Sequence, residues 1–138
     1  MKFCFLMYPW ERINPETDST LRLIHEAVSR GHTVAITTPN NLTMRESVAL
    51  AFCQVIKKEP VSPNIVSFYK SVAFKKAQLP IAGFDVIMMR ANPPLDTMAL
   101  NFLDSVRTDT FIMNDIDGLR LANNKLYTAS LHDPHNEF

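Results

Sequence analysis

An apolar run near the middle of the chain ends abruptly in a cation, an amide and two prolines. Residues 84–89 read Phe-Asp-Val-Ile-Met-Met, and Arg90, Ala91, Asn92 and Pro93-Pro94 follow. A continuous apolar run is typical of a strand that is covered on both faces, as in a parallel sheet. Because proline lacks the donor that a strand ladder needs, the strand ends at Arg90 or soon after. The run therefore predicts an α/β fold with a buried strand leading into a loop.

Arg90 is the first candidate for function. In an open α/β sheet, ligands bind in the crevice outside the carboxyl ends of the strands, so a guanidinium at that edge faces whatever the domain binds. The structural alternative is a salt bridge between Arg90 and a neighbouring helix. The sequence leaves both roles open.

Length and charge exclude several classes of protein. The 138 residues leave room for one hydrophobic core, and 14 basic residues balance 14 acidic ones without clustering. We therefore expect neither a nucleic acid nor a membrane as partner. The apolar start, residues 1–8, is too short for a membrane span or a signal sequence, and the expected location is cytoplasmic.

The two cysteines and four histidines indicate no metal site. Cys4 and Cys53 lie in apolar surroundings without metal-ligand spacing, which predicts reduced thiols in the core. The histidines form no cluster with them, and the last two lie close to the end of the chain; the four are His25, His32, His132 and His135.

The first 38 residues predict a strand, a helix and a second strand. Residues 2–8 and 33–38 are the strands, and residues 9–17 form an unusually long loop. Asp18 or Ser19 caps the helix, which Gly31 ends. Strand, helix and strand at this spacing form a right-handed parallel unit.

The middle of the chain is ambiguous. Residues 42–58 fit a helix by propensity, or two antiparallel strands that turn at residues 45–47. We expect a loop over residues 59–63, and a short strand or an irregular helix over residues 65–79.

The last third predicts two helices and a buried strand. Asp96 caps a helix that runs through Val106, with Met98 and Phe102 on the same face as Val106. Residues 110–113 are the strand. Asp115 or Asp117 begins the last helix, whose expected apolar side consists of Leu119, Ala122, Leu126 and Ala129.

Three further motifs are candidates for a site, and each has a structural alternative. Residues 18–20, Asp-Ser-Thr, open a helix where free amides favour an anion, but they are also ordinary caps. Asn114 and Asp115 follow a strand at the same edge as Arg90, although this pair is also common in turns. Lys125 is by itself more typical of a solvated side chain than of a phosphate ligand.

Several catalytic motifs are missing from the sequence. The only glycines are Gly31, Gly83 and Gly118, so neither a dinucleotide fingerprint nor a P-loop can be written. The sequence also shows no serine nucleophile elbow, zinc helix or cysteine nucleophile. We therefore expect no complete active site in this chain.

Taken in order, these segments resemble the N-terminal domain of the bacterial glutathione synthetases in the ATP-grasp superfamily. The most specific match covers residues 85–96, where the family reads Asp-Val-Ile-Leu-Met-Arg-Lys-Asp-Pro-Pro-Phe-Asp. The resemblance also favours two antiparallel strands for residues 42–58. Further matching motifs are residues 7–9, 17–20, 30–32, 114–116, 119–120 and 123–126.

The resemblance implies a three-layer, Rossmann-like pre-ATP-grasp domain over residues 1–124, with residues 125–138 beginning the link to an ATP-grasp domain that is missing here. It implies an ATP-dependent ligase that phosphorylates a carboxylate to an acyl phosphate, which an amine then attacks. The full-length enzyme would use ATP and Mg²⁺, while this chain alone would bind neither well and would be inactive. An amino acid or peptide substrate is expected, and also a homo-oligomer.

The resemblance also implies roles for single residues. Arg90 would bind a substrate carboxylate or the reacting phosphoryl group, and Ser19 and Asn92 would line the pocket. Asn114 is a candidate for the rim through its position after a strand at the same edge, not through the resemblance. Lys125 would reach an ATP phosphate at the domain border.

Departures from the family pattern lie in the pocket. Thr17 replaces a lysine, and Ala91-Asn92 replaces Lys-Asp, so specificity for γ-glutamylcysteine and glycine is in doubt. Two alternatives stay open: the N-terminal half of a two-domain glycosyltransferase, and a stand-alone α/β module that binds a small molecule.

Overall fold

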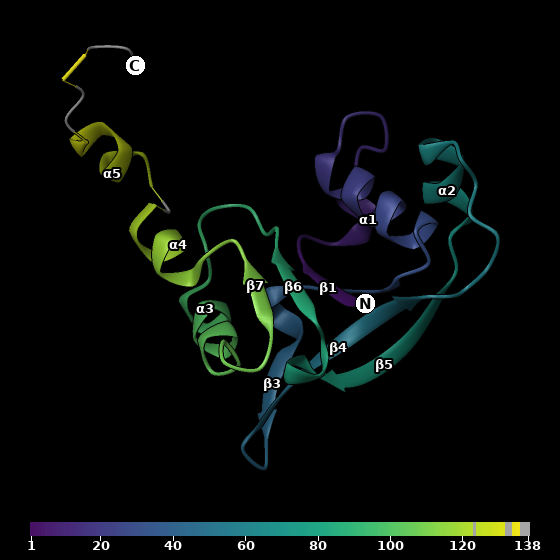
Figure 1. Ribbon diagram of the computed structural model, residues 1–138, viewed down its shortest axis with the longest axis horizontal. Coiled ribbons are helices and arrows are strands. Elements are labelled where there is room, and N and C mark those ends of the chain that lie inside the picture. Colours follow the sequence, from purple (N-terminus) through teal and green to yellow (C-terminus); the bar gives the residue numbers. More distant parts are fainter. Residues whose placement is uncertain (123, 132–133, 136–138) are drawn as a thin grey trace.

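The computed structural model describes residues 1–122, 124–131 and 134–135, and within them seven strands form one sheet. The strand order is β3-β4-β2-β1-β6-β7, with β5 also paired to β4 (Figure 1). Strands β2, β1, β6 and β7 are parallel, whereas β4 runs antiparallel to β2, β3 and β5. The strands are β1 Lys2–Leu6, β2 Thr33–Thr37, β3 Leu42–Arg45, β4 Val48–Ile56, β5 Phe74–Pro80, β6 Val86–Met89 and β7 Phe111–Met113.

Helices cover both faces of the sheet, which confirms the mostly parallel α/β fold. Helices α1 (Ser19–Ser29) and α2 (Ile65–Ser71) lie on one face, and α3 (Thr97–Asp104) lies on the other. The C-terminal segment, made of α4 (Ile116–Ala122) and α5 (Lys125–Ser130), leads away from the sheet (Figure 1). Three short 3-10 turns are η1 (Trp10–Arg12), η2 (Pro39–Asn41) and η3 (Ile81–Gly83).

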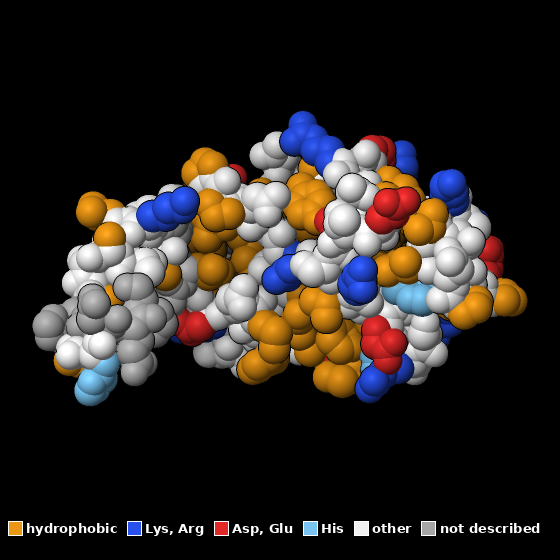
Figure 2. Space-filling model, turned by 90° about the horizontal axis from the view of Figure 1, so that it is seen from above, with side chains coloured by type: hydrophobic (Ala, Val, Ile, Leu, Met, Phe, Trp, Pro, Cys, Tyr) orange, Lys and Arg blue, Asp and Glu red, His pale blue; other side chains and the backbone are white. Residues whose placement is uncertain are grey.

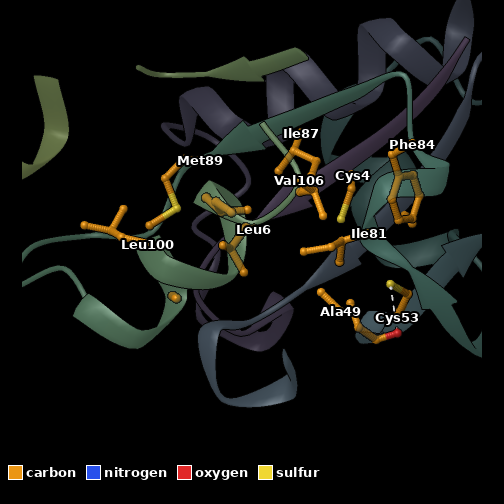
Figure 3. Packing of buried hydrophobic residues seen from close by; sticks show 14 of the residues in the cluster. Cys4, Leu6, Ala49, Cys53, Ile81, Phe84, Ile87, Met89, Leu100 and Val106 are labelled. Atoms are coloured by element: carbon orange, nitrogen blue, oxygen red, sulfur yellow. Dashed lines mark hydrogen bonds between the residues drawn. The ribbon is translucent and has the colours of Figure 1, made fainter. Parts of the chain in front are cut away.

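The core has two halves because successive side chains of a strand point to opposite faces. On β1, Cys4 and Leu6 belong to the half under α3, while Phe5 belongs to the half under α1 and α2. Figure 3 shows the α3 half, in which Cys53 donates to the carbonyl of Ala51. Both cysteines are buried and free, as the sequence predicts.

The predicted strand–helix–strand unit is confirmed. The Asp18 carboxylate caps α1 by accepting from the Leu21 amide at 2.8 Å. At the other end Gly31 has φ of +81°, and its amide and that of His32 donate back into the last turn. This αL ending stops the helix and directs the chain into β2 beside β1.

The ambiguous middle segment forms strands. β3 and β4 make a hairpin whose two turn residues, Glu46 and Ser47, have φ of 50° and 63°. Positive φ at both turn positions gives a tight two-residue hairpin turn a twist that matches that of the strands. Asparagine and glycine are the residues that usually adopt this conformation. Residues 65–79 contain both α2 and β5, rather than a strand or a helix alone.

The predicted apolar face of α3 is wrong at Met98, whereas Phe102 is partly buried against the core as expected. Met98 is 62% exposed, and the helix buries Ala99, Leu100 and Leu103 instead. Val106 is buried, but it lies beyond the end of α3. The error arises because this helix is short and packs through two adjacent rows of side chains rather than one.

Two further burial predictions at the C-terminus are wrong in part, although Ile112 and Leu119 pack against the core as expected. Strand β7 is an edge strand, and Phe111 and Met113 are exposed on the side that α1 leaves uncovered. The last predicted helix is two short helices, and Leu126 on α5 is 78% exposed. Figure 2 shows hydrophobic side chains exposed over this C-terminal segment, at the left of the view. Asp115 does begin α4, because its carboxylate accepts from the Gly118 amide.

Within the described part of the chain, no helix is both long and apolar enough to cross a membrane. His132 lies outside the described residues.

Candidate functional site

A hollow lies where the loops after β1, β6 and β7 meet the start of α1. Its volume is about 300 Å³. We call it the Arg90 hollow, and its lining residues are Tyr8, Ser19, Thr20, Met89, Arg90, Ala91, Asn92, Pro93, Leu95, Asn114, Leu119 and Ala122. It lies at the carboxyl edge of the parallel strands, where open α/β sheets bind their ligands.

Arg90 is held by neutral hydroxyl groups rather than by a carboxylate. Its Nη2 donates to Ser19 Oγ at 2.9 Å, and its Nε donates to Thr20 Oγ1 at 3.1 Å. Its backbone amide donates to the Leu6 carbonyl at 2.7 Å, which extends the β1–β6 ladder by one residue. Among the described residues Arg90 forms no ion pair, so the predicted structural alternative of a salt bridge is wrong: the helix contact is neutral.

This arrangement leaves part of the guanidinium available. Arginine carries five N–H donors in a rigid fork, and Nη1 makes no hydrogen bond to the described residues. The two hydroxyl contacts fix the plane of the fork without neutralising its charge. A carboxylate or phosphoryl oxygen is the group that such a fork binds best.

The residues that line the hollow carry a net positive charge. Among the lining residues Arg90 alone carries a charged side chain. Ser19 and Thr20 occupy the first turn of α1, where free amides and the helix dipole also favour an anion. Both features point to a negatively charged ligand.

Tyr8 lines the hollow, and its hydroxyl is paired with Asp18, which is not one of the lining residues. The Tyr8 hydroxyl donates to one carboxylate oxygen of Asp18, while the other oxygen caps α1. Burial, together with the hydrogen bond to Asp18, raises the pKa of Tyr8 above its ordinary value. The phenol therefore remains a neutral donor, and Asp18 is turned toward the helix and Tyr8 rather than toward Arg90.

Four of the five predicted site residues line one hollow. Ser19, Arg90, Asn92 and Asn114 come from three separate loops or helix starts, and the fold places them together. Lys125 does not line it: this residue is exposed at the start of α5, where Asn124 caps the helix. Tyr8 is a lining residue that sequence reasoning did not select, although its place at the end of the first strand could have indicated it.

The lining of the Arg90 hollow contains no side chain of the kind that Mg²⁺ prefers. Mg²⁺ takes carboxylate oxygens, and no carboxylate lines the Arg90 hollow. In the described ranges, no three His, Cys, Asp or Glu side chains gather in a way that could hold a metal ion. The chain also lacks a glycine-rich phosphate loop.

The fold and the site together define a Rossmann-like α/β domain with a hollow at the carboxyl edge of its parallel strands, lined by an arginine that forms no ion pair within the described residues. A family model described as "Prokaryotic glutathione synthetase, N-terminal domain" matches residues 1–120, and the chain belongs to this family.

Relatives named glutathione synthetase align with nearly the whole chain. The protein from Bradyrhizobium diazoefficiens is 33% identical over 90% of this chain, and that from Gloeobacter violaceus is 32% identical over 97%. The protein from Escherichia coli K12 is 31% identical over 96%. The chain spans only 39% to 42% of the length of these relatives.

Proposed function

We propose that this chain is the substrate-side domain of an ATP-dependent carboxylate–amine ligase of the glutathione synthetase type. Membership of the family supports the ligase class over the glycosyltransferase alternative. The observation that carries the site is the Arg90 guanidinium, which two hydroxyls orient and no carboxylate neutralises.

In this proposal Arg90 binds the substrate carboxylate, or the phosphoryl group on it, through the part of its fork that faces the hollow. Ser19 and Thr20 hold the guanidinium in place, and Asn92 and Asn114 offer amide groups to the uncharged parts of the substrate. The reaction would pass through an acyl phosphate that an amine attacks. Positioning and charge stabilisation are what this domain contributes.

In this proposal ATP and Mg²⁺ are bound by the rest of the full-length enzyme. Two observations support it: no carboxylate lines the Arg90 hollow, and the sequence lacks a glycine-rich phosphate loop. We place the domain boundary near residue 124, with residues 125–138 beginning the link, and Lys125 reaching an ATP phosphate only after the next domain is in place. The chain alone would then be inactive.

The test uses the full-length protein from the natural gene. ADP release is measured with γ-glutamylcysteine and glycine, and with other dipeptide and amino-acid pairs, because Thr17, Ala91 and Asn92 depart from the family pattern. Substrate-dependent ADP release supports the ligase. Binding of a small molecule without any ATP turnover would favour the stand-alone binding module.

Arg90→Ala in the same protein tests the site. Loss of a hydrogen-bonded charged contact costs about 2 kcal/mol, so kcat/KM should fall by about thirtyfold or more. Arg22→Ala is the matched control, because Arg22 is an exposed arginine on α1 whose side chain, among the described residues, hydrogen-bonds the Glu16 carbonyl alone, at 3.2 Å. Turnover of Arg90→Ala within about twofold of the control would remove Arg90 from the site.

We also propose self-association of the protein. Phe111, Met113 and Leu126 expose apolar surface, and contiguous exposed apolar surface marks interaction sites. Sedimentation of the chain and of a Phe111→Ser, Met113→Ser variant measures this. A strictly monomeric parent chain would refute the proposal.

A further inference from the structure

A second hollow lies on the open face of strands β4 and β5. Its volume is about 610 Å³, which is within the usual range for small-molecule sites. We call it the β4–β5 hollow. The residues that carry the argument are Trp10, Glu11, Phe52, Gln54, Lys76 and Gln78.

The strand register explains why the floor of this hollow is open. Phe52 pairs with Gln78, and Gln54 pairs with Lys76, so these four side chains share one face of the sheet. The next pair on that face is Ile56 with Phe74, which Trp10 covers with a ring contact at 5.2 Å. The cover ends there, and Phe52 is 53% exposed.

The wall and the floor of the hollow carry opposite charges that form no ion pair with each other. Glu11 belongs to η1 at the wall, and Lys76 projects from the floor. Across the described ranges, neither side chain forms an ion pair or a hydrogen bond, and the same holds for the side chains of Gln54 and Gln78. By contrast, Asn41 at the rim already donates to Thr38.

We infer that the β4–β5 hollow binds a short peptide or amino acid with both termini charged. Lys76 takes the carboxylate, Glu11 takes the ammonium group, and Phe52 packs against an apolar side chain. The two glutamines supply donors and acceptors for a peptide group. A ligand with a single charge would pair with either Lys76 or Glu11. It would exclude water from the other of these two side chains without pairing its charge, which disfavours binding.

This site is separate from the Arg90 hollow and does not depend on the proposed ligase function. The two hollows are lined by consecutive residues of one loop. Tyr8 lines the Arg90 hollow, and Pro9, Trp10 and Glu11 line the β4–β5 hollow. The lining residues of the two hollows do not overlap.

The experiment is a nuclear magnetic resonance titration of the ¹⁵N-labelled 138-residue chain with the dipeptide glycyl-phenylalanine. We expect saturable shifts of the amides of residues 52–54 and 76–78 at millimolar dipeptide. The N-acetyl form lacks the ammonium charge, and the C-terminal amide form lacks the carboxylate. Each should bind about two- to fivefold more weakly, the range that exposed ion pairs contribute.

Variants assign the charges to residues. Lys76→Gln should remove the preference for the free carboxylate, and Glu11→Gln the preference for the free ammonium group. Lys75→Gln is the matched control, because Lys75 is an exposed neighbour on the opposite face of β5. Amide spectra that keep their dispersion show that the variants are folded.

Three results would overturn the inference. One is the absence of saturable shifts in residues 52–54 and 76–78. Another is equal binding of the free and the capped dipeptides. The third is shifts confined to the Arg90 hollow, which would show that the dipeptide binds there instead.

Discussion

The two hollows lie on either side of residues 8–11, and they differ in whether the protein itself hydrogen-bonds their charged side chains. In the Arg90 hollow the cation is half-buried and tied to Ser19 and Thr20. In the β4–β5 hollow Glu11 and Lys76 are exposed and bonded to nothing else in the described part of the chain. A side chain held by its own protein has little entropy left to lose on binding, whereas a free one loses rotamer freedom. The first arrangement suits catalysis and the second suits weak, reversible binding.

The strongest test compares a buried residue of α1, the helix that starts at the Arg90 hollow, with an exposed residue on the floor of the β4–β5 hollow. Ile24 is a residue of α1 that is fully buried in the core half between this helix and the sheet, so Ile24→Ala should lower the free energy of unfolding by about 3 kcal/mol. Phe52→Ala is the counterpart. Because Phe52 is an exposed side chain, its removal should change the free energy of unfolding by at most about 0.5 kcal/mol. Urea denaturation measures both. Equal losses would show that the β4–β5 face is covered in solution.

A smaller effect is expected when one bond to the guanidinium is removed. Thr20→Val keeps the shape of a buried side chain but deletes the acceptor for Arg90 Nε. In the full-length protein kcat/KM should fall by about tenfold, because hydrogen bonds to charged groups contribute about 1.5 kcal/mol or more. Thr37→Val is the control: Thr37 is a buried threonine whose hydroxyl donates to the Phe52 carbonyl and not to the guanidinium of Arg90. A similar loss in both variants would mean that Thr20 acts only through stability.

Loss of a helix cap should separate stability from function. Asp18→Ala and Asn64→Ala each delete a cap, of α1 and α2 respectively, and each should cost about 1 kcal/mol of unfolding free energy. In the full-length protein only Asp18→Ala should also lower turnover, because Asp18 holds Tyr8 at the Arg90 hollow. Unchanged turnover in Asp18→Ala would remove the Tyr8–Asp18 pair from the site.

The smallest effect concerns alkaline pH. The pKa of Tyr8 is raised above its ordinary value of 10.0, by burial first and by Asp18 second. A raised pKa means that this contribution to stability is fully present below pH 10.0 and is lost as the pH rises through the folded-state pKa. Asp18→Asn should therefore bring the pKa of Tyr8 closer to 10.0 without removing the whole shift. The pKa of Tyr8 is measured by following tyrosinate absorbance against pH and subtracting the titration curve of the Tyr8→Phe variant.

Cys4 and Cys53 are titratable groups that lie in the core and do not line the Arg90 hollow, the proposed reaction site. The hydrogen bond and the charge of Cys53, together with burial, raise the pKa of Cys4 well above its usual value. Both thiols sit among apolar side chains of the α3 half of the core (Figure 3). Cys4 is therefore an inert core residue rather than a nucleophile.

Local signals predicted much of the fold. The Asp18 cap and the Gly31 stop define α1 within a few residues, because caps act on the nearest turn of backbone. The apolar run before Arg90 likewise predicted β6. The hairpin at residues 46–47 was ambiguous, since neither Glu46 nor Ser47 carries the usual sequence signal for positive φ.

By itself the sequence determined the α/β class, the first parallel unit and the presence of Arg90 at the end of a strand. Only the tertiary structure decided which residues share a hollow, because Arg90 meets Ser19 and Thr20 across about 70 residues of chain. It also decided that Phe111 and Met98 are exposed, since burial depends on what covers a face and not on the hydrophobicity of the residue. The face of β4 and β5 is open for the same reason: its cover ends at Phe74.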